Sequence, residues 1–229
     1  LALLTATYFS EVGNFVERTT KGTSTLRLGA GASVLEAMVF PQIREIRSRI
    51  PGLELELVTD STQRILRSLH EGELDIGIVR SGDHGADVVT YPCGRMEFAF
   101  VGRTDFDRHL PDWGLAHCLS RMPMAMLRGS GQFASGFRKL CVDLEVSPNI
   151  VVRTESFGQI RQALSAGIPG GILPRCLTAN MTSSEFRVVK DEGLSVLARD
   201  FVLVMDKRVT QLKTRLSGIA ECVSTLMGQ

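Results

Sequence analysis

Residues 63–80, with the sequence QRILRSLHEGELDIGIVR, constrain the fold more than any other part of the chain. The first half places apolar side chains on one face of a helix, and Gly72 can adopt the left-handed conformation that ends a helix. The side chains on this face are Ile65, Leu66 and Leu69. The apolar run at 76–79 then predicts a short strand that is buried on both faces. A helix joined by so short a turn to a buried strand is typical of an α/β domain.

Strand and helix patterns alternate along most of the chain. Strands are predicted at residues 26–28, 53–59, 76–79, 98–101, 122–127, 150–153, 171–173 and 201–205. Helices are predicted at residues 33–50, 63–71, 133–144, 158–166 and 209–226. This alternation implies parallel sheets with right-handed crossovers. We expect the strand at 98–101 to lead out of the first lobe.

The first helix and the strand after it carry further local signals. Ser33 is predicted to cap the helix, and Glu36 completes a capping box with it. Pro41 falls inside the helix and predicts a kink, because proline lacks the N–H that an inner turn requires. Leucine and glutamate alternate over residues 53–57, which predicts a half-exposed strand at a sheet edge.

The charge balance argues against a domain that binds nucleic acid by itself. The 229 residues include 26 lysines and arginines and 25 aspartates and glutamates, whereas nucleic-acid-binding domains are usually strongly basic. Apolar residues make up 44% of the chain, which is enough to build real cores. Such a length allows one large domain or two lobes of about 100 residues each. No apolar run is long enough to predict a membrane span.

The cysteines and histidines form no recognisable motif for a metal or a cofactor. The five cysteines are widely spaced without a C-x-x-C pair, and the four histidines make no H-E-x-x-H pattern. We therefore expect no metal and no cofactor. The favoured interpretation is unreactive thiols in a reducing cytosol, and a redox-active disulfide pair is the alternative. The residues concerned are Cys93, Cys118, Cys141, Cys176 and Cys222.

The first 18 residues predict an amphipathic helix that requires a partner helix. Apolar side chains recur at helical spacing from Leu1 to Val16, and the polar stretch at 19–24 is typical of a linker. A helix packed on its own domain is the alternative. The segment lacks the basic start of a signal peptide, so we expect a cytoplasmic protein. The chain does not begin with methionine, which indicates a fragment of a longer protein.

Four strand-to-helix turns combine backbone N–H groups with small hydroxyl side chains. They lie at residues 29–33, 59–62, 128–131 and 154–156. Free N–H groups at a helix start bind anions, and the carboxyl ends of parallel strands meet at one sheet edge. The recurrence predicts a small-molecule site, although each hydroxyl alone is better explained as a helix cap. Arginines near strand ends either pair with an acidic ligand or form ion pairs within the protein; they are Arg80, Arg128 and Arg153.

Several short motifs resemble those of one family, the LysR-type transcriptional regulators. EGELDIGI at residues 71–78 resembles the EGELDLAI signature of the effector-binding domain in that family, and PGLEL at residues 51–55 also fits. Ala-Gly at 166–167 and Leu-Pro at 173–174 agree as well. The resemblance covers residues 26–226. One departure is Gly-Ile-Pro at 167–169, where the family usually has Gly-x-Gly; Gly170 and Gly171 follow directly.

The resemblance implies a fold and a division of the chain. The implied fold class is α/β, with two Rossmann-like lobes joined by two crossing strands, as in type 2 periplasmic binding proteins. Residues 1–22 are then the end of a linker helix and its hinge. Lobe I comprises residues 23–95 and 203–229, and lobe II comprises residues 96–202.

The resemblance also implies a function, which is that of a regulator domain and not of an enzyme. A small anionic effector is expected in the cleft between the lobes, where it controls DNA binding and transcription. DNA is contacted only through a winged helix-turn-helix that we expect outside this chain. We expect a homodimer through the first two helices and the strand at 53–59, and a tetramer in the full protein. The residues assigned to the effector are Ala32, Ser33, Thr62, Arg128, Ser130 and Thr154.

Two other classes of function fit parts of the sequence. A solute-binding protein of an ABC-type transport system shares the bilobed architecture, but five unpaired cysteines and the lead-in helix disfavour it. A nicotinamide-dependent enzyme is suggested by Gly29 and Gly31 before a helix and by Asp60 after the next strand. Val34 stands where the third glycine of that fingerprint is needed, which argues against this enzyme. No serine elbow or phosphate loop occurs, and no cysteine stands out as a nucleophile.

Overall fold

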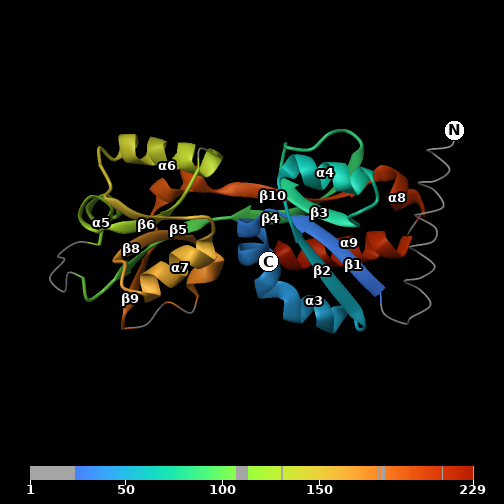
Figure 1. Cartoon of the computed structure of the whole chain (residues 1–229), viewed down its shortest axis with the longest axis horizontal. Coiled ribbons are helices and arrows are strands. Elements are labelled where there is room, and N and C mark those ends of the chain that lie inside the picture. Colours follow the sequence, from blue (N-terminus) through green and yellow to red (C-terminus); the bar gives the residue numbers. More distant parts are fainter. Residues whose placement is uncertain are drawn as a thin grey trace. The chain divides into compact units, whose positions relative to one another are not determined.

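The computed structural model describes residues 24–106, 113–129, 131–179, 181, 184–212 and 214–228. The predicted helix at 1–18 and its hinge lie outside these residues. The described residues form two compact units, each built on its own five-stranded sheet (Figure 1). Unit 1 comprises residues 24–35, Val39–Gly94 and 200–228, and unit 2 comprises Glu36–Met38 and the described part of Arg95–Arg199. Both units alternate strands and helices, which confirms the α/β class.

The sheet of unit 1 has a strand at its edge where the sequence predicts one. Its strands are β1 (Ser24–Ala30), β2 (Leu53–Thr59), β3 (Ile76–Arg80), β4 (Val88–Met96) and β10 (Arg199–Asp206). The strand order is β2-β1-β3-β10-β4. β2 and β3 run parallel to β1, whereas β10 runs antiparallel to β3. The edge position of β2 and its exposed glutamates confirm the half-exposed edge strand.

Helices cover both faces of this sheet (Figure 1). The first helical segment consists of α2 (Ala32–Val34), a π-helical turn (Leu35–Val39), a 3-10 turn (Phe40–Gln42) and α3 (Ile43–Arg49). The other helices are α4 (Thr62–His70), α8 (Lys207–Leu212) and α9 (Thr214–Met227). The right-handed crossovers from β1 to β2 and from β2 to β3 run in opposite directions, so α3 and α4 lie on opposite faces. α9 packs against α3.

Pro41 interrupts the first helix, as predicted. Proline has no N–H for the carbonyl of Ala37, four residues earlier, and the helix widens to π geometry before Pro41. The carbonyl of Ala37 accepts a hydrogen bond from the thiol of Cys176, with an S···O distance of 2.9 Å. Cys176, far away in the sequence, therefore donates the hydrogen bond to the Ala37 carbonyl that Pro41 cannot donate.

The capping box predicted at Ser33 is wrong. β1 ends at Ala30 and the helix begins at Ala32, earlier than expected. Its N-cap is therefore Gly31, which has no side chain to bond to the first turn. Ser33 lies inside that first turn. The carboxylate of Glu36 accepts a hydrogen bond from the backbone N–H of Gly158 instead, at 2.9 Å.

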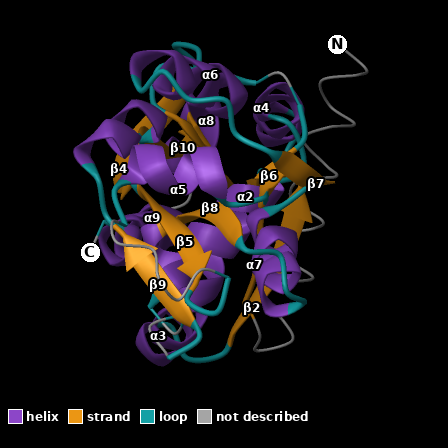
Figure 2. Ribbon diagram, turned by 90° about the vertical axis from the view of Figure 1, so that its left-hand side faces the viewer, coloured by secondary structure: helices purple, strands orange, loops and turns teal. Residues whose placement is uncertain are grey.

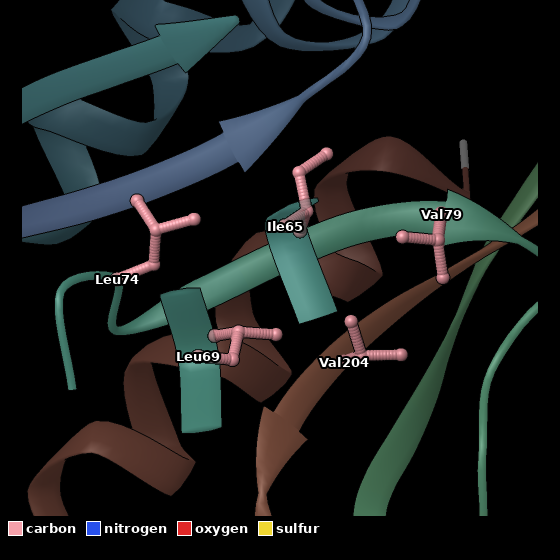
Figure 3. Close-up of a cluster of buried hydrophobic side chains, with 5 residues drawn as sticks. All are labelled: Ile65, Leu69, Leu74, Val79 and Val204. Atoms are coloured by element: carbon pink, nitrogen blue, oxygen red, sulfur yellow. The ribbon is translucent and has the colours of Figure 1, made fainter. Parts of the chain in front are cut away.

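The core of unit 1 forms around the joint between α4 and β3, in the stretch at residues 63–80. Gly72 ends α4 with φ +75°, as predicted. A Cβ on Gly77 would lie 2.6 Å from Cγ2 of Ile65, so α4 packs directly on the backbone of β3. The side chains buried together at this joint are Ile65, Leu69, Leu74, Val79 and Val204 (Figure 3). The predicted order of helix, turn and buried strand is confirmed.

The sheet of unit 2 has the same mixed character. Its strands are β5 (Phe98–Arg103), β6 (Met124–Leu127), β7 (Ile150–Thr154), β8 (Gly170–Pro174) and β9 (Phe186–Val189), and their order is β7-β6-β8-β5-β9. β7 and β8 run parallel to β6, whereas β5 is antiparallel to both β8 and β9. Figure 2 shows β9 beside β5. The strands at 122–127, 150–153 and 171–173 are thus confirmed, with small shifts at their ends.

Three helices and two short 3-10 segments surround this sheet. The helices are α5 (Leu115–Arg121), α6 (Gln132–Asp143) and α7 (Phe157–Ser165), and the 3-10 segments are Arg175–Thr178 and Glu192–Leu197. The crossovers from β6 to β7 and from β7 to β8 run in opposite directions, so α6 and α7 cover opposite faces (Figure 1). No helix within the described ranges is long and apolar enough to cross a membrane.

The strand that leads out of unit 1 is β4, and not the predicted strand at 98–101. The chain passes from unit 1 to unit 2 between Gly94 and Arg95, inside β4, and returns at the start of β10. Phe98–Arg103 belongs to the sheet of unit 2. Pro92 and Gly94 interrupt the alternation of β4, which explains why its sequence does not read as a strand.

Gly170 and Gly171 allow close packing at β8, after the unusual Gly-Ile-Pro sequence. A Cβ on Gly170 would lie 2.8 Å from Cζ of Phe100, and a Cβ on Gly171 would lie 2.8 Å from Cγ2 of Ile160. The two glycines are therefore required by their neighbours on opposite faces of the sheet, and β8 forms despite the departure from the family pattern.

Candidate functional site

Two helix starts come together at the carboxyl edge of the unit 1 sheet. β1 and β2 are parallel neighbours, and their last residues, Ala30 and Thr59, are register partners. The N–H of Asp60 donates to the carbonyl of Ala30 at 3.2 Å, which ties the two turns together. The first turns of the two helices, with Ser33 and Thr62, follow directly. Three of the six predicted effector residues, with Ala32 next to Ser33, therefore share one sheet edge.

These two helix starts keep free hydrogen-bond donors. The N-caps, Gly31 and Ser61, are extended and make no side-chain cap. Within the described part of the chain, the half-buried hydroxyls of Ser33 and Thr62 have no hydrogen-bond partner. Backbone N–H groups at the positive end of a helix, with free hydroxyls beside them, are suited to bind a small anion.

The acidic turn of the signature sequence lies at the opposite end of β3 and serves the fold. The Asp75 carboxylate accepts from the N–H of Arg27 at 2.9 Å, and the Glu73 carboxylate accepts from the Ser68 hydroxyl at 2.8 Å. Glu71 pairs with an arginine one turn earlier in α4. Among the residues that the structure describes, no three His, Cys, Asp or Glu side chains gather as a metal ion requires.

In unit 2 the corresponding edge carries Arg128 and Thr154, but their polar groups already have partners. β6 and β7 end in register, and the N–H of Arg128 donates to the carbonyl of Thr154 at 2.7 Å. The buried Thr154 hydroxyl donates to the carbonyl of Ser156 at 3.2 Å, and the Arg128 guanidinium pairs with Glu155 at 3.2 Å. Ser130 lies outside the described residues. The structure thus brings Arg128 and Thr154 together, but their side chains already bond to other groups of the protein.

Side chains cap the start of α7, which agrees with the explanation of the hydroxyls at 154–156 as helix caps. Ser156 is the N-cap, and its hydroxyl accepts from the N–H of Gln159 at 3.3 Å. The Gln159 side chain accepts from the N–H of Glu155 at 2.8 Å, and Glu36 accepts from Gly158. The S-x-x-Q spacing at 156–159 is a capping-box signal that predicts the first of these contacts. No local signal links Glu36 to Gly158.

The other arginines near strand ends do not form a site. Arg80 pairs with Asp83 at 2.9 Å, which supports the interpretation of an ion pair within the protein. Arg153 is exposed at the end of β7. These side chains therefore give no reason to extend the site beyond the helix starts.

Three of the five thiols have raised pKa values. Burial raises the pKa of the Cys93 thiol to about 12, and it also raises the pKa values of Cys141 and Cys176. All five cysteines are free. A thiol with a raised pKa is protonated at neutral pH, and the thiolate is the reactive form. This supports the interpretation of unreactive thiols.

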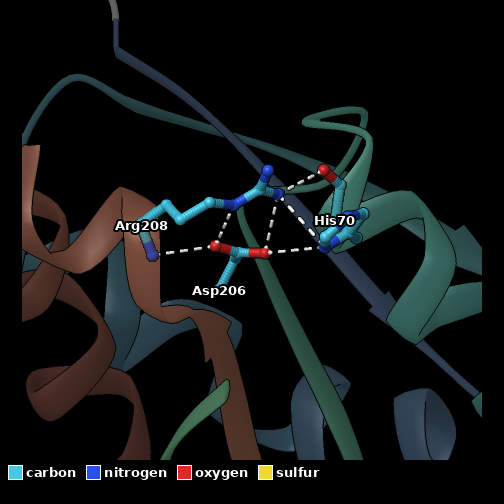
Figure 4. A network of polar contacts seen from close by, with 3 residues as sticks. All are labelled: His70, Asp206 and Arg208. Carbon is cyan, nitrogen blue, oxygen red and sulfur yellow. Dashed lines mark hydrogen bonds and ion pairs between the residues drawn. The ribbon is translucent and has the colours of Figure 1, made fainter. Parts of the chain in front are cut away.

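A charged cluster in unit 1 joins α4 to the start of α8 (Figure 4). The Asp206 carboxylate, whose side chain is only 5% exposed, accepts from Nε and Nη2 of Arg208 at 2.9 Å each and from the backbone N–H of Arg208 at 2.8 Å. Nδ1 of His70 lies 3.4 Å from the same carboxylate, and Nη2 of Arg208 donates to the carbonyl of His70 at 2.6 Å. The cluster is fully paired and structural in character.

This cluster predicts a dependence of stability on pH. Burial opposes ionisation of Asp206, but the hydrogen bonds from Arg208 outweigh it and lower the pKa of the carboxyl below its usual range. A folded-state pKa below the unfolded value of about 4 means that ionised Asp206 stabilises the fold above that pH. The stabilisation is lost as the pH falls through the folded-state pKa. We expect the stability gap between wild type and Asp206→Asn, measured by urea unfolding, to shrink on acidification below about pH 4; a constant gap would contradict this.

Comparison with known proteins connects this geometry to a family. Residues 20–215 match the family described as the LysR substrate binding domain. The HTH-type transcriptional regulator TtuA of Agrobacterium vitis is 35% identical over 69 residues, which cover 30% of this chain and 23% of that protein. The chain therefore aligns with less than a quarter of the length of this relative.

Solved structures share the fold. The reduced regulatory domain of OxyR2 from Vibrio vulnificus aligns with a TM-score of 0.67 and 20% identity, covering 90% of this chain and 96% of that one. Full-length CbnR in complex with its target DNA aligns with a TM-score of 0.71 and 12% identity, covering 100% of this chain and 80% of that one. At these identities the similarity is one of fold.

Proposed function

Because this chain belongs to the family of LysR substrate-binding domains, we propose that it binds the small-molecule effector of a bacterial transcriptional regulator. Its two α/β units have the fold of type 2 periplasmic-binding-protein-like domains. The role of the family is regulatory and not catalytic. The family match favours this function over that of a solute-binding protein in an ABC-type transport system.

We propose that the effector is anionic and binds at the helix starts of unit 1. The supporting observation is the pair of free hydroxyls, Ser33 and Thr62, beside two uncapped helix starts at one sheet edge. The nearby carboxylate of Asp60 already accepts a hydrogen bond from the N–H of Ser61, at 2.7 Å. An anion at this edge gains charge-assisted hydrogen bonds, which are stronger than neutral ones.

We propose that the effector regulates the protein by shifting an equilibrium between two conformational states. An effector changes the state of a protein only if it binds one state more tightly than another. DNA would then be read by a winged helix-turn-helix in the longer protein, and the effector would bias its state. We propose homodimers, and tetramers in the full protein; the position of β2 at the sheet edge, with its outward face exposed, supports a role in pairing.

The test of the site uses two single substitutions, Ser33→Ala and Thr62→Val. A thermal-shift screen of small carboxylates and inorganic anions identifies a binding anion, and calorimetry then measures its affinity. Each substitution removes one hydrogen-bond donor to a charged group, so we expect each to raise Kd by about tenfold. The fold should be unchanged, because neither hydroxyl has a partner among the described residues.

Matched controls remove hydroxyls from helices of unit 1 away from the sheet edge. Ser48→Ala in α3 and Thr225→Val in α9 each delete a hydroxyl that donates to a carbonyl of its own helix. Both controls should keep the wild-type Kd. Equal affinities for Ser33→Ala, Thr62→Val and the wild type would remove these residues from the site.

A further inference from the structure

A carboxylate lies at the carboxyl edge of the unit 1 sheet, beside the two helix starts. Asp60 directly follows β2, and its backbone N–H donates to the carbonyl of Ala30, the last residue of β1, at 3.2 Å. The side chain turns toward the start of α4, because its Oδ1 accepts from the N–H of Ser61 at 2.7 Å. Asp60 is therefore held within the same two turns that lead to Ser33 and Thr62.

One oxygen of this carboxylate has no partner in unit 1. The hydrogen bond from Ser61 and the ion pair with Nε of Arg64, at 3.9 Å, both involve Oδ1. Among the described residues of unit 1, no group bonds to Oδ2. The Arg64 side chain is 77% exposed, and an exposed pair of this kind contributes little. Oδ2 is thus a free, charged acceptor beside the proposed anion site.

The local contacts do not explain why residue 60 is charged. An asparagine oxygen would accept from the N–H of Ser61 as the carboxylate does. The sequence suggests a second explanation, in which Asp60 binds the ribose of a dinucleotide, but Val34 argues against it. A negative charge before a helix also stabilises the positive end of that helix, whether or not a ligand is bound. A cationic group of the effector is the remaining partner for this charge.

The two turns of unit 1 leave room for a small ligand that carries both signs of charge. A Cβ on Gly31 would have no described atom of unit 1 within 4 Å. Neighbouring strands lie about 5 Å apart, so a molecule of a few atoms reaches the turns after both. The free hydroxyls and uncapped N–H groups suit a negative group, and Asp60 suits a positive group next to it.

We infer that Asp60 is a specificity-determining residue of the effector site, and that the effector is an α-amino acid. The inference rests on the proposed binding of an anionic group at Ser33 and Thr62, which is here the α-carboxylate. The α-ammonium group donates to Oδ2 of Asp60 in a charge-assisted hydrogen bond. An α-hydroxy acid offers only a neutral donor to the same oxygen, and a plain carboxylate is repelled by its charge.

Three compounds with the same carbon skeleton separate this effect from size. L-Alanine carries an ammonium group on its second carbon, L-lactate carries a hydroxyl there, and propionate carries only hydrogen. Each is titrated into the 15N-labelled 229-residue chain at the same pH and salt concentration, and the amide signals of Ser33 and Thr62 are followed by NMR. In the wild type, Kd should rise from L-alanine to L-lactate to propionate, with a difference of about tenfold between the first and the last.

Asp60→Asn removes the charge and keeps an oxygen that accepts from Ser61. It should raise the Kd of L-alanine about tenfold and lower the Kd of propionate slightly, so that the preference disappears. Asp87→Asn is the matched control. Asp87 is exposed, and its carbonyl accepts from Lys207 after the end of β10, at the opposite edge of the unit 1 sheet. This control should keep the wild-type preference.

The outcomes separate the role of Asp60 from the proposed site. If the compounds shift Ser33 and Thr62 but Asp60→Asn keeps the wild-type preference, Asp60 acts only on the helix, and its role in specificity is overturned. Equal Kd values for L-alanine and propionate in the wild type overturn it without any variant. If only another anion from the thermal-shift screen shifts Ser33 and Thr62, the site stands and the α-amino acid is wrong. If no anion shifts them, the site and the role of Asp60 both fall.

Discussion

Replacement of Ile65 with alanine is expected to lower the free energy of unfolding by about 3–4 kcal/mol. The Ile65 side chain is 1% exposed and lies at the centre of the cluster between α4 and β3. It packs on the backbone of two strands, because both Gly29 and Gly77 leave room for it. Backbone atoms cannot collapse into the space that the substitution leaves, so the cavity persists. Urea unfolding followed by circular dichroism measures the loss.

Val142→Ala is the matched control for this core substitution. Val142 lies in α6 with 74% of its surface exposed, so its methyl groups contribute little and the change should stay within about 0.5 kcal/mol. A loss below about 1 kcal/mol for Ile65→Ala would mean that the joint between α4 and β3 is not the packing centre described here.

Replacement of Arg208 with alanine is expected to cost about 2–3 kcal/mol. The Arg208 side chain is 58% exposed, so its own burial contributes little. The cost arises at Asp206, which is buried and loses the two guanidinium hydrogen bonds, while His70 and the backbone N–H of residue 208 stay beside it. Removal of one partner from a buried charge is expensive because the remaining charge stays desolvated.

The control for Arg208→Ala is Arg67→Ala, which breaks an exposed pair with Glu71 at 3.6 Å. Exposed pairs of this kind contribute less than about 1 kcal/mol. Addition of Asp206→Asn to Arg208→Ala should recover part of the lost stability, because it removes the unpaired charge. Equal small losses for both arginine variants, in the same urea unfolding assay, would show that the cluster is not a stabilising element.

Features that depend on near neighbours in the chain could be predicted from the sequence. The joint at 63–80 is confirmed because its helical face, its terminating Gly72 and its apolar strand are all encoded within eighteen consecutive positions. The edge strand β2 and the interruption at Pro41 are confirmed for the same reason, since alternation and the missing N–H of proline act locally.

Features that depend on distant partners could not be predicted. Glu36 and Gly158 are 122 positions apart, and the spacing from Ser33 to Glu36 suggested a local cap instead. β4 contains a proline and a glycine, and it forms because β10 pairs with it in the sheet. His70 and Arg208 come together only through the fold. In each example a tertiary contact outweighs the local preference.

The candidate site was predictable in part for the same reason. Parallel strands end at one edge, so the turns that carry Ser33 and Thr62 had to come together once the sheet formed. The same rule placed Arg128 beside Thr154. The sequence could not show that the hydroxyl of Thr154 and the start of α7 already have partners, since these contacts depend on side-chain positions.

The most direct test of the central claim is an NMR map of the binding anion from the thermal-shift screen on the 15N-labelled chain. We expect the largest amide shifts on Ala32, Ser33 and Thr62, at the carboxyl edge of the unit 1 sheet, and no shifts in the acidic turn at 71–75. Shifts centred on the acidic turn, or a binding anion that leaves Ser33 and Thr62 unchanged, would contradict it.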